Sequence, residues 1–328
     1  MMRAILCEAH GMPEDLAFRD LAVPQPGAGE VRIRVAAAGV NFPDALMIQN
    51  KYQVQPALPF SPGGEAAGWI EAIGDGVTGW AVGDRVAAMT VSGAFAEQVV
   101  VKADRVLSLP DAVPFDVAAV FTTAYGTAFH ALKDRGQLKP GETVLVLGAS
   151  GGVGLAAVEV AKAMGAHVVA AASSQEKLSL AEAHGADTLV DYSGGDLRAA
   201  LKAAVGNRPI DVIYDPVGGA LSEAAFRSIG RYGRHLVIGF AAGDVPSIAL
   251  NLPLLKAASV VGVFWGSFTV IESEAHRANM AQLYAWLGEG QLKPLISRRF
   301  PLEQAAEALR CLMNRDALGK VVVTVAAD

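Results

Sequence analysis

The sequence has little of several features that would point to whole classes of protein. Its 328 residues include only two cysteines, Cys7 and Cys311, which are far apart and flanked by apolar residues, so we expect two buried thiols rather than a disulfide or a metal site. No apolar run reaches the ~18 residues of a membrane span. The apolar start of the chain is interrupted at Glu8, which argues against a secretory signal. We therefore expect a cytoplasmic protein whose first residues form a β-strand.

Positive charge is also scarce. The net charge is −6, and basic residues gather no further than pairs such as Arg298 and Arg299, so neither nucleic acid nor a membrane surface is an expected partner. The six histidines show no spacing typical of a triad or a metal site, and most are expected at the surface or at helix ends. With 52% hydrophobic and 18% charged residues, the chain is expected to be compact and long enough for two domains.

The most informative segment is 144–154, where an apolar strand leads into Gly-Ala-Ser-Gly-Gly-Val-Gly and then into a helix. Such a turn aims backbone N–H groups of the helix start at a dinucleotide pyrophosphate. It departs from G-x-G-x-x-G because Ala149 stands at the first glycine position, with an extra Gly148 before it. The surrounding strand–helix–strand unit of about 30 residues supports the assignment. The residues predicted to contact the pyrophosphate are Ser150, Gly151, Gly152 and Val153.

The end of the following strand indicates which dinucleotide binds. An NAD site usually places an acid there, which accepts a hydrogen bond from the ribose 2′-hydroxyl. Here the strand ends at Ser173 and Ser174, and Lys177 follows one helical turn later, so hydroxyls and a cation are placed to hold a 2′-phosphate. Glu176 opposes this only mildly, since an acid also suits a helix start. We therefore predict NADPH. The alternative for Lys177 is a solvated charge on a helix.

The rhythm of the chain predicts two domains. The first part has short strands between Gly/Pro turns and no long helices, which indicates a mainly β unit. From about Phe115 onward, strands and helices alternate, which indicates a doubly wound parallel sheet of about six strands. We predict a catalytic domain at 1–122, completed by 267–328, and a dinucleotide-binding domain at 123–266. The nicotinamide is expected in a cleft between them.

Seven motifs in this order resemble the medium-chain dehydrogenase/reductase superfamily, and within it the zinc-independent quinone oxidoreductases. The motifs are Ala38–Asp44 with Tyr52, Pro62–Glu65, Val82–Val86, Thr122–Tyr125, Gly148–Gly154, Asp187–Tyr192 and Asp215–Gly219. Together they cover essentially the whole chain. The resemblance implies an α/β fold in which a Rossmann doubly wound parallel sheet is joined to a mainly β, GroES-like catalytic domain.

The resemblance also implies a reaction without a metal. Zinc alcohol dehydrogenases of this superfamily have a cysteine where this chain has Asn41 and a histidine where it has Gly64, and their Cys-rich loop has no counterpart at 90–110. Without a Lewis acid, simple alcohol oxidation is disfavoured. Reduction of quinones or small activated alkenes, such as enones and haloacrylates, is expected. The alternatives are an enoyl-CoA or acrylyl-CoA reductase and a non-catalytic NADPH-binding protein.

Three catalytic residues are implied by the resemblance. The amide of Asn41 would donate to the substrate or to the cofactor carboxamide, Tyr52 would relay a proton, and Asp44 would line the same pocket. Asp44 is equally suited to the first turn of a helix. Related enoyl-thioester reductases often have Tyr and Arg where this chain has Leu46 and Ile48. We therefore expect a more apolar pocket, with water completing the proton transfer.

Further cofactor contacts are implied at Asn41, along the second domain and in the last strand of the chain. They are Asn41, Thr123, Thr127, Tyr192, Gly239, Phe240, Phe264, Trp265, Gly266 and Lys320. A surface position is the alternative for Tyr192, and pure packing is the alternative for Phe240 and Trp265. The strand at 259–264 is expected at a sheet edge that relatives pair across a two-fold axis, so we predict a homodimer.

Overall fold

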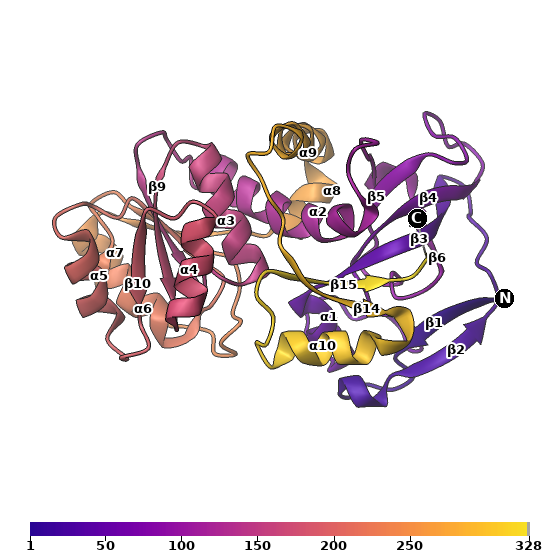
Figure 1. The fold of residues 1–328 in the computed structure, drawn as a ribbon, viewed down its shortest axis with the longest axis horizontal. Coiled ribbons are helices and arrows are strands. Elements are labelled where there is room, and N and C mark those ends of the chain that lie inside the picture. Colours follow the sequence, from indigo (N-terminus) through magenta and orange to yellow (C-terminus); the bar gives the residue numbers. More distant parts are fainter. Residues whose placement is uncertain (327–328) are drawn as a thin grey trace. The chain divides into compact units, whose positions relative to one another are not determined.

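The computed structural model describes residues 1–326, which fold into two compact units (Figure 1). Unit 1 contains residues 1–123 and the segment from Pro294 onward, and unit 2 contains residues 124–293. None of the helices in the described part of the chain is both long and apolar enough to span a membrane.

The return of the chain to unit 1 lies later than predicted. The first boundary falls one residue after the expected one, but the segment 267–293 stays in unit 2. It does so because helix α9 (Ser273–Gly288) buries one face there. Asn279 on that face accepts a hydrogen bond from Lys133 Nζ at 2.6 Å, and His276 packs edge-on against Trp265. An amphipathic pattern predicts a buried face without saying which unit covers it.

Unit 2 is built on a six-stranded parallel sheet in the order β10-β9-β8-β11-β12-β13, the doubly wound arrangement that was predicted. Its strands are β8 (Thr143–Leu147), β9 (His167–Ala172), β10 (Thr188–Asp191), β11 (Val212–Asp215), β12 (Arg234–Val237) and β13 (Ser259–Gly262). Its remaining helices are α3 (Gly152–Ala163), α4 (Gln175–Ala183), α5 (Leu197–Val205), α6 (Gly219–Ser228), α7 (Asn251–Lys256) and α8 (Trp265–Ile271).

The strand order determines where a ligand binds in unit 2. Every residue of β8 is buried, as expected for a parallel strand covered on both faces. The order of the strands reverses direction between β8 and β11, and sheets of this type bind ligands outside the carboxyl ends of the strands at such a switch point. The turns 148–154 and 215–219 lie at these two ends.

Unit 1 is mainly β, as predicted. Its larger sheet has the order β14-β15-β3-β4-β5-β7, with β6 also paired to β3, and β1 and β2 form a separate pair. The strands are β1 (Met2–Leu6), β2 (Ala17–Leu21), β3 (Glu30–Val40), β4 (Glu65–Ile73), β5 (Arg85–Met89), β6 (Gln98–Lys102), β7 (Val106–Ser108), β14 (Ile296–Pro301) and β15 (Lys320–Thr324). The helices are η1 (Pro13–Asp15), α1 (Phe42–Ile48), η2 (Ala103–Arg105), η4 (Leu302–Gln304) and α10 (Ala305–Met313). Helix α2 (Phe115–Phe129) and its π-helical continuation η3 (His130–Arg135) run from unit 1 into unit 2.

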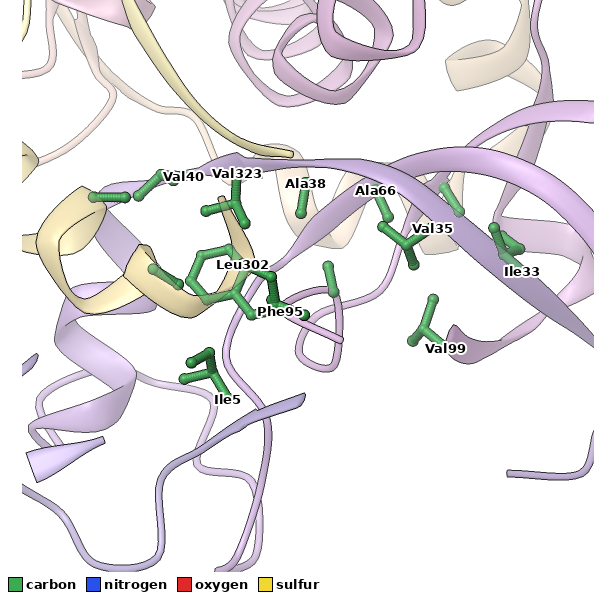
Figure 2. Packing of buried hydrophobic residues seen from close by; sticks show 14 of the residues in the cluster. Ile5, Ile33, Val35, Ala38, Val40, Ala66, Phe95, Val99, Leu302 and Val323 are labelled. Carbon is green, nitrogen blue, oxygen red and sulfur yellow. The ribbon is translucent and has the colours of Figure 1, made fainter. Parts of the chain in front are cut away.

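The C-terminal strand completes the core of unit 1. Figure 2 shows Val323 of β15 beside Val40 and near Leu302 and Phe95, and all four side chains are buried. Strand β15 pairs antiparallel with β3, with Val321 opposite Val40. Lys320 therefore lies beside the end of β3, where Asn41 begins helix α1.

Candidate active site and cofactor site

Two glycines of the turn after β8 are required by close packing. Gly148 has a φ of +60°, and a Cβ there would lie 2.9 Å from Cγ2 of Val217. A Cβ at Gly154 would lie 2.2 Å from the carbonyl oxygen of Gly148. Ala149, in the place of the missing glycine, is fully buried, and its N–H donates to Ala171 O at 3.2 Å. The departure from G-x-G-x-x-G is harmless because the residue that must lack a side chain is Gly148.

The start of helix α3 fits an anion. Gly151 precedes the helix in an extended conformation, and a Cβ added there would find its nearest neighbour at 3.5 Å. The first N–H groups of an α-helix, here those of Gly152 and Val153, have no acceptor within the helix. Gly151, Gly152 and Val153 are half-buried, whereas Ser150 is buried. An open backbone with unpaired N–H groups suits a pyrophosphate, so these residues fit the predicted dinucleotide.

The structure brings together the residues predicted for the ribose phosphate. Ser174 is the N-cap of α4 and accepts from the Lys177 N–H, while Lys177 Nζ donates to Ser173 Oγ, both at 3.4 Å. Ser173 and Glu176 are exposed. Tyr192 follows β10, and its N–H donates to Ala172 O at the end of β9. A cation and a hydroxyl at an exposed strand end fit a 2′-phosphate.

The remaining predicted cofactor residues of unit 2 have different environments. Phe240 and Phe264 are 37% and 64% exposed, Gly239 and Thr127 are half-buried, and Gly266 is exposed. Trp265 is buried, and a Cβ at Gly126 would lie 2.7 Å from its ring, so the indole packs directly on α2. This contact favours the packing alternative for Trp265.

Unit 1 contains a buried polar cluster at the start of α1. The Asn41 N–H donates to Asp44 Oδ2 at 2.8 Å, which places Asp44 in the first turn of the helix. In its side-chain amide, Asn41 Nδ2 donates to Glu65 Oε1 at 2.8 Å, and Oδ1 accepts from Lys320 Nζ at 2.6 Å. All four residues are at most 8% exposed. Asp44 was interpreted either as a residue of the catalytic pocket or as a residue of the first helical turn. The two interpretations are compatible, because the start of α1 lies within the polar cluster.

Glu65 and Lys320 form a buried ion pair with the Nζ–Oε1 distance at 3.3 Å. Glu65 Oε2 also accepts the backbone N–H of Thr123 at 2.9 Å, whereas Thr123 Oγ1 points to Met89 Sδ at 3.7 Å. The sequence singled out Glu65 only as part of a motif, although a carboxylate opening the buried strand β4 is a signal in itself. An ammonium group at this place repels a metal cation, so the cluster does not fit zinc.

Asp44 and Tyr52 differ in how they hold a proton. Complete burial raises the pKa of Asp44 to about 7, with the N–H of Asn41 opposing and the charge of Glu65 adding to this effect. Its Oδ1 has no well-formed hydrogen bond. Burial and the charge of Asp44 raise the pKa of the half-buried Tyr52. The carboxyl, rather than the phenol, is therefore the group that titrates near neutrality.

Leu46 and Ile48, the two side chains that distinguish this chain from enoyl-thioester reductases, differ in burial. Leu46 is half-buried, but Ile48 is completely buried in the core of unit 1. The expected apolar pocket can therefore include Leu46, whereas the side chain of Ile48 packs in the core of unit 1.

Several histidines are buried, against expectation. His130, His235 and His276 are at most 6% exposed, and His235 Nε2 lies 3.0 Å from Asp215 Oδ2. Asp215 also accepts the N–H groups of Val217 and Gly218, both at 2.9 Å, and the hydroxyl of Ser222. This carboxylate shapes the turn at Asp215–Gly219, whose Val217 packs on Gly148.

Metal ligands do not gather elsewhere in the described chain. Within residues 1–326, no group of three or more His, Cys, Asp or Glu side chains is arranged to hold a metal ion. Cys7 and Cys311 are free and buried, as predicted.

Comparisons with known proteins cover both units. The family described as alcohol dehydrogenase GroES-like domain matches residues 27–111, and that described as zinc-binding dehydrogenase matches residues 152–285. Over 324 residues, the chain is 37% identical to quinone oxidoreductase-like protein 2 of Mus musculus, covering 98% of this chain and 92% of that protein. It is 34% identical over 326 residues to quinone oxidoreductase of Homo sapiens, covering 98% of each.

A solved structure gives the same result for the fold. The crystal structure of Escherichia coli quinone oxidoreductase complexed with NADPH matches this chain with a TM-score of 0.91 at 28% identity, covering 98% of this chain and 99% of that chain.

Proposed function

The chain belongs to the zinc-independent quinone oxidoreductase family of the medium-chain dehydrogenases and reductases, and from this premise we propose that it transfers a hydride from NADPH to a quinone or a small activated alkene. It is an oxidoreductase by its family. The preference for NADPH, the metal-free reaction and the acceptor are our proposals.

The observation that carries the proposal is the buried Asn41–Glu65–Lys320 cluster of unit 1. It provides an amide donor, a carboxylate and a fixed cation where a zinc-dependent relative would need soft or imidazole ligands. A fixed cation beside a neutral donor suits the stabilisation of negative charge that develops on an oxygen. A conjugated carbonyl requires such stabilisation, because negative charge develops on its oxygen when its carbon skeleton accepts a hydride.

The residues of unit 2 support the choice of cofactor. The start of α3 supplies backbone donors for the pyrophosphate, and Ser173, Ser174 and Lys177 supply hydroxyls and a cation for a 2′-phosphate. NADPH, when bound, supplies the hydride.

The chemistry in unit 1 then needs one donor and one proton. An amide nitrogen carries two protons, and Asn41 Nδ2 gives one of them to Glu65. We assign the second to the substrate oxygen that gains charge. Because its pKa is raised to about 7, Asp44 can hold a proton at neutral pH, and with Tyr52 it is the proposed source of the proton that completes the reduction. The hydride and this proton together convert a quinone to a hydroquinone, or an activated C=C to C–C.

The direct test is NADPH oxidation with 1,4-benzoquinone, an enone and crotonyl-CoA as separate acceptors. We expect turnover with quinone or enone, a lower rate with NADH, and no effect of a chelator. Asn41→Ala should lower kcat by about 100-fold, the cost of losing one oxyanion donor. Faster reduction of crotonyl-CoA would make the protein an enoyl-thioester reductase. NADPH binding without any turnover would make it a binding protein, and zinc-reversible inhibition by the chelator would refute the metal-free assignment.

We also propose a homodimer formed through β13. This strand lies at the edge of the unit 2 sheet, and Val260 within it is 47% exposed. Leu250, Leu254 and Leu255, just before it in the chain, are each at least 77% exposed. An open strand edge beside exposed leucines is typical of a protein interface. Light scattering should give twice the monomer mass for the parent protein and the monomer mass for Val260→Lys; a monomeric parent would overturn the proposal.

A further inference from the structure

The ammonium group of Lys320 uses all its donors inside unit 1. A lysine ammonium has three protons. Three acceptors surround Nζ: Asn41 Oδ1 at 2.6 Å, Glu65 Oε1 at 3.3 Å and Val40 O at 3.4 Å. The residue is only 6% exposed. The sequence-based prediction that Lys320 contacts the cofactor therefore requires one of these bonds to break.

The same contacts fix which way the Asn41 amide faces. A lysine ammonium only donates and a carboxylate only accepts, so the amide oxygen must face Lys320 and the amide nitrogen must face Glu65. The reversed amide would place NH₂ against the ammonium and an oxygen against the carboxylate, losing both bonds. Glu65 is itself held through Oε2 by the Thr123 N–H. The orientation of the second Nδ2–H bond of Asn41 is therefore fixed.

We infer that Lys320 is a positioning residue, which orients and polarises the Asn41 amide so that its second Nδ2 proton becomes a stronger donor to the substrate oxygen. The inference deepens the proposed function and rests on it. Positive charge at the amide oxygen draws electrons from the nitrogen, and hydrogen bonds in such a chain strengthen one another. Lys320 acts through Asn41 and touches neither substrate nor cofactor.

The fold explains why the residue comes from the far end of the chain. Asn41 follows β3, and β15 pairs with β3 through Val321 and Val40. This register places Lys320, one residue earlier, against the amide, although 279 positions separate the two residues in sequence. The site of unit 1 is therefore complete only when the C-terminal strand has added to the sheet.

The kinetic test is a double-mutant cycle between Lys320→Met and Asn41→Ala. Because Lys320 acts through Asn41, Lys320→Met should lower kcat for quinone reduction about tenfold, with the KM for NADPH unchanged, and should lower it no further in the Asn41→Ala background. Equal losses in both backgrounds, or a raised KM for NADPH at unchanged kcat, would overturn the inference. Lys102→Met is the matched control, because this exposed lysine of β6 pairs with Glu30. It should leave kcat unchanged.

A second measurement does not depend on turnover. In protein labelled with ¹⁵N-asparagine, the Asn41 side-chain amide should give separate, slowly exchanging proton signals, which should broaden or exchange rapidly in Lys320→Met. Unchanged signals would overturn the positioning role even if the enzyme is active. If the parent protein reduces no acceptor, the proposed function fails, but the NMR result still decides whether Lys320 orients Asn41. If Lys320→Met does not fold, the neutral pair Glu65→Gln/Lys320→Met replaces it in both measurements.

Discussion

The two proposed sites, one in each unit, are built in opposite ways. In unit 2 the phosphate turn is one continuous segment, 148–154, and the groups offered to the ligand belong to the backbone. In unit 1 the cluster is made of side chains from separate segments, with Asn41 and Lys320 279 positions apart. The turn depends on positions that cannot carry a side chain, Gly148 and Gly154. The cluster depends on the pairing of two buried charges, Glu65 and Lys320.

This difference determines how each part fails. A backbone site tolerates many side chains but is disrupted by one Cβ in the wrong place. A buried cluster of charges tolerates changes of shape poorly and loses most when one partner is removed, because the other charge stays buried. The four predictions below test this contrast, from the largest expected effect to the smallest.

Removing one charge from the cluster should have the largest effect on stability. Lys320→Met leaves Glu65, only 1% exposed, without its cation, and breaking a buried pair costs about 3–5 kcal/mol. The double variant Glu65→Gln/Lys320→Met buries no net charge and should recover most of this loss. Urea unfolding of the three proteins measures both effects. Equal stability of the single and double variants would show that the pair is not what holds the cluster.

The second prediction concerns pH. Burial raises the pKa of Asp44 from an ordinary 3.8 to about 7, so between these values the unfolded carboxyl loses its proton while the folded one keeps it. The contribution of Asp44 to stability is therefore complete below about pH 4 and lost as the pH rises through 7. The charged and titratable groups that face Asp44 are Glu65, Lys320 and Tyr52. They are unchanged in the Asp44→Asn variant, so a comparison of this variant with the parent protein isolates the titration of Asp44.

Asp44→Asn keeps an acceptor for the Asn41 N–H and removes the titration. Between pH 5 and pH 8 the parent should lose about 3 kcal/mol relative to this variant, at about 1.4 kcal/mol for each pH unit of the window. Urea unfolding at the two pH values gives the difference. Parallel pH profiles would mean that the carboxyl is ionised in the folded state.

The contrast also explains what could be predicted from the sequence. Gly148 and Gly154 lie within one motif, so their spacing predicted the turn. The alternation of strands and helices predicted the doubly wound sheet, and seven motifs together indicated the family. Glu65 was singled out only as part of a motif, and the contacts of Lys320 with Asn41 and Glu65 were not predicted, because these contacts depend on the pairing of β15 with β3. The chain was predicted to return to unit 1 at residue 267, but it does so at Pro294. The reason is similar, because the sequence pattern of α9 shows that the helix has an apolar face but not which unit covers that face.

A third prediction tests the turn by adding a single methyl group. In Gly154→Ala the new Cβ would lie 2.2 Å from the Gly148 carbonyl oxygen, so α3 must move away from the turn. We expect a loss of about 1–3 kcal/mol in the free energy of unfolding, together with weaker NADPH binding. Gly151→Ala is the control, because its Cβ would meet nothing closer than 3.5 Å and its φ is −77°. Its stability should be that of the parent; equal losses in both variants would refute the packing explanation.

The smallest effect should come from Lys177, the cation proposed to make the site of unit 2 prefer NADPH. Lys177 lies on the surface of α4, with Nζ 3.4 Å from Ser173 Oγ, so its removal should change stability by less than about 0.5 kcal/mol. If its ammonium holds the 2′-phosphate, Lys177→Met should weaken NADPH binding about tenfold, or about 1.4 kcal/mol, and leave NADH binding unchanged. Fluorescence titration with both dinucleotides measures this. A parallel loss for NADPH and NADH would mean that Lys177 supports the whole cofactor, and no loss for either would place the selectivity for the 2′-phosphate in the serines or the backbone. Only a loss confined to NADPH supports the view that the backbone turn binds a dinucleotide and this single charge decides which one.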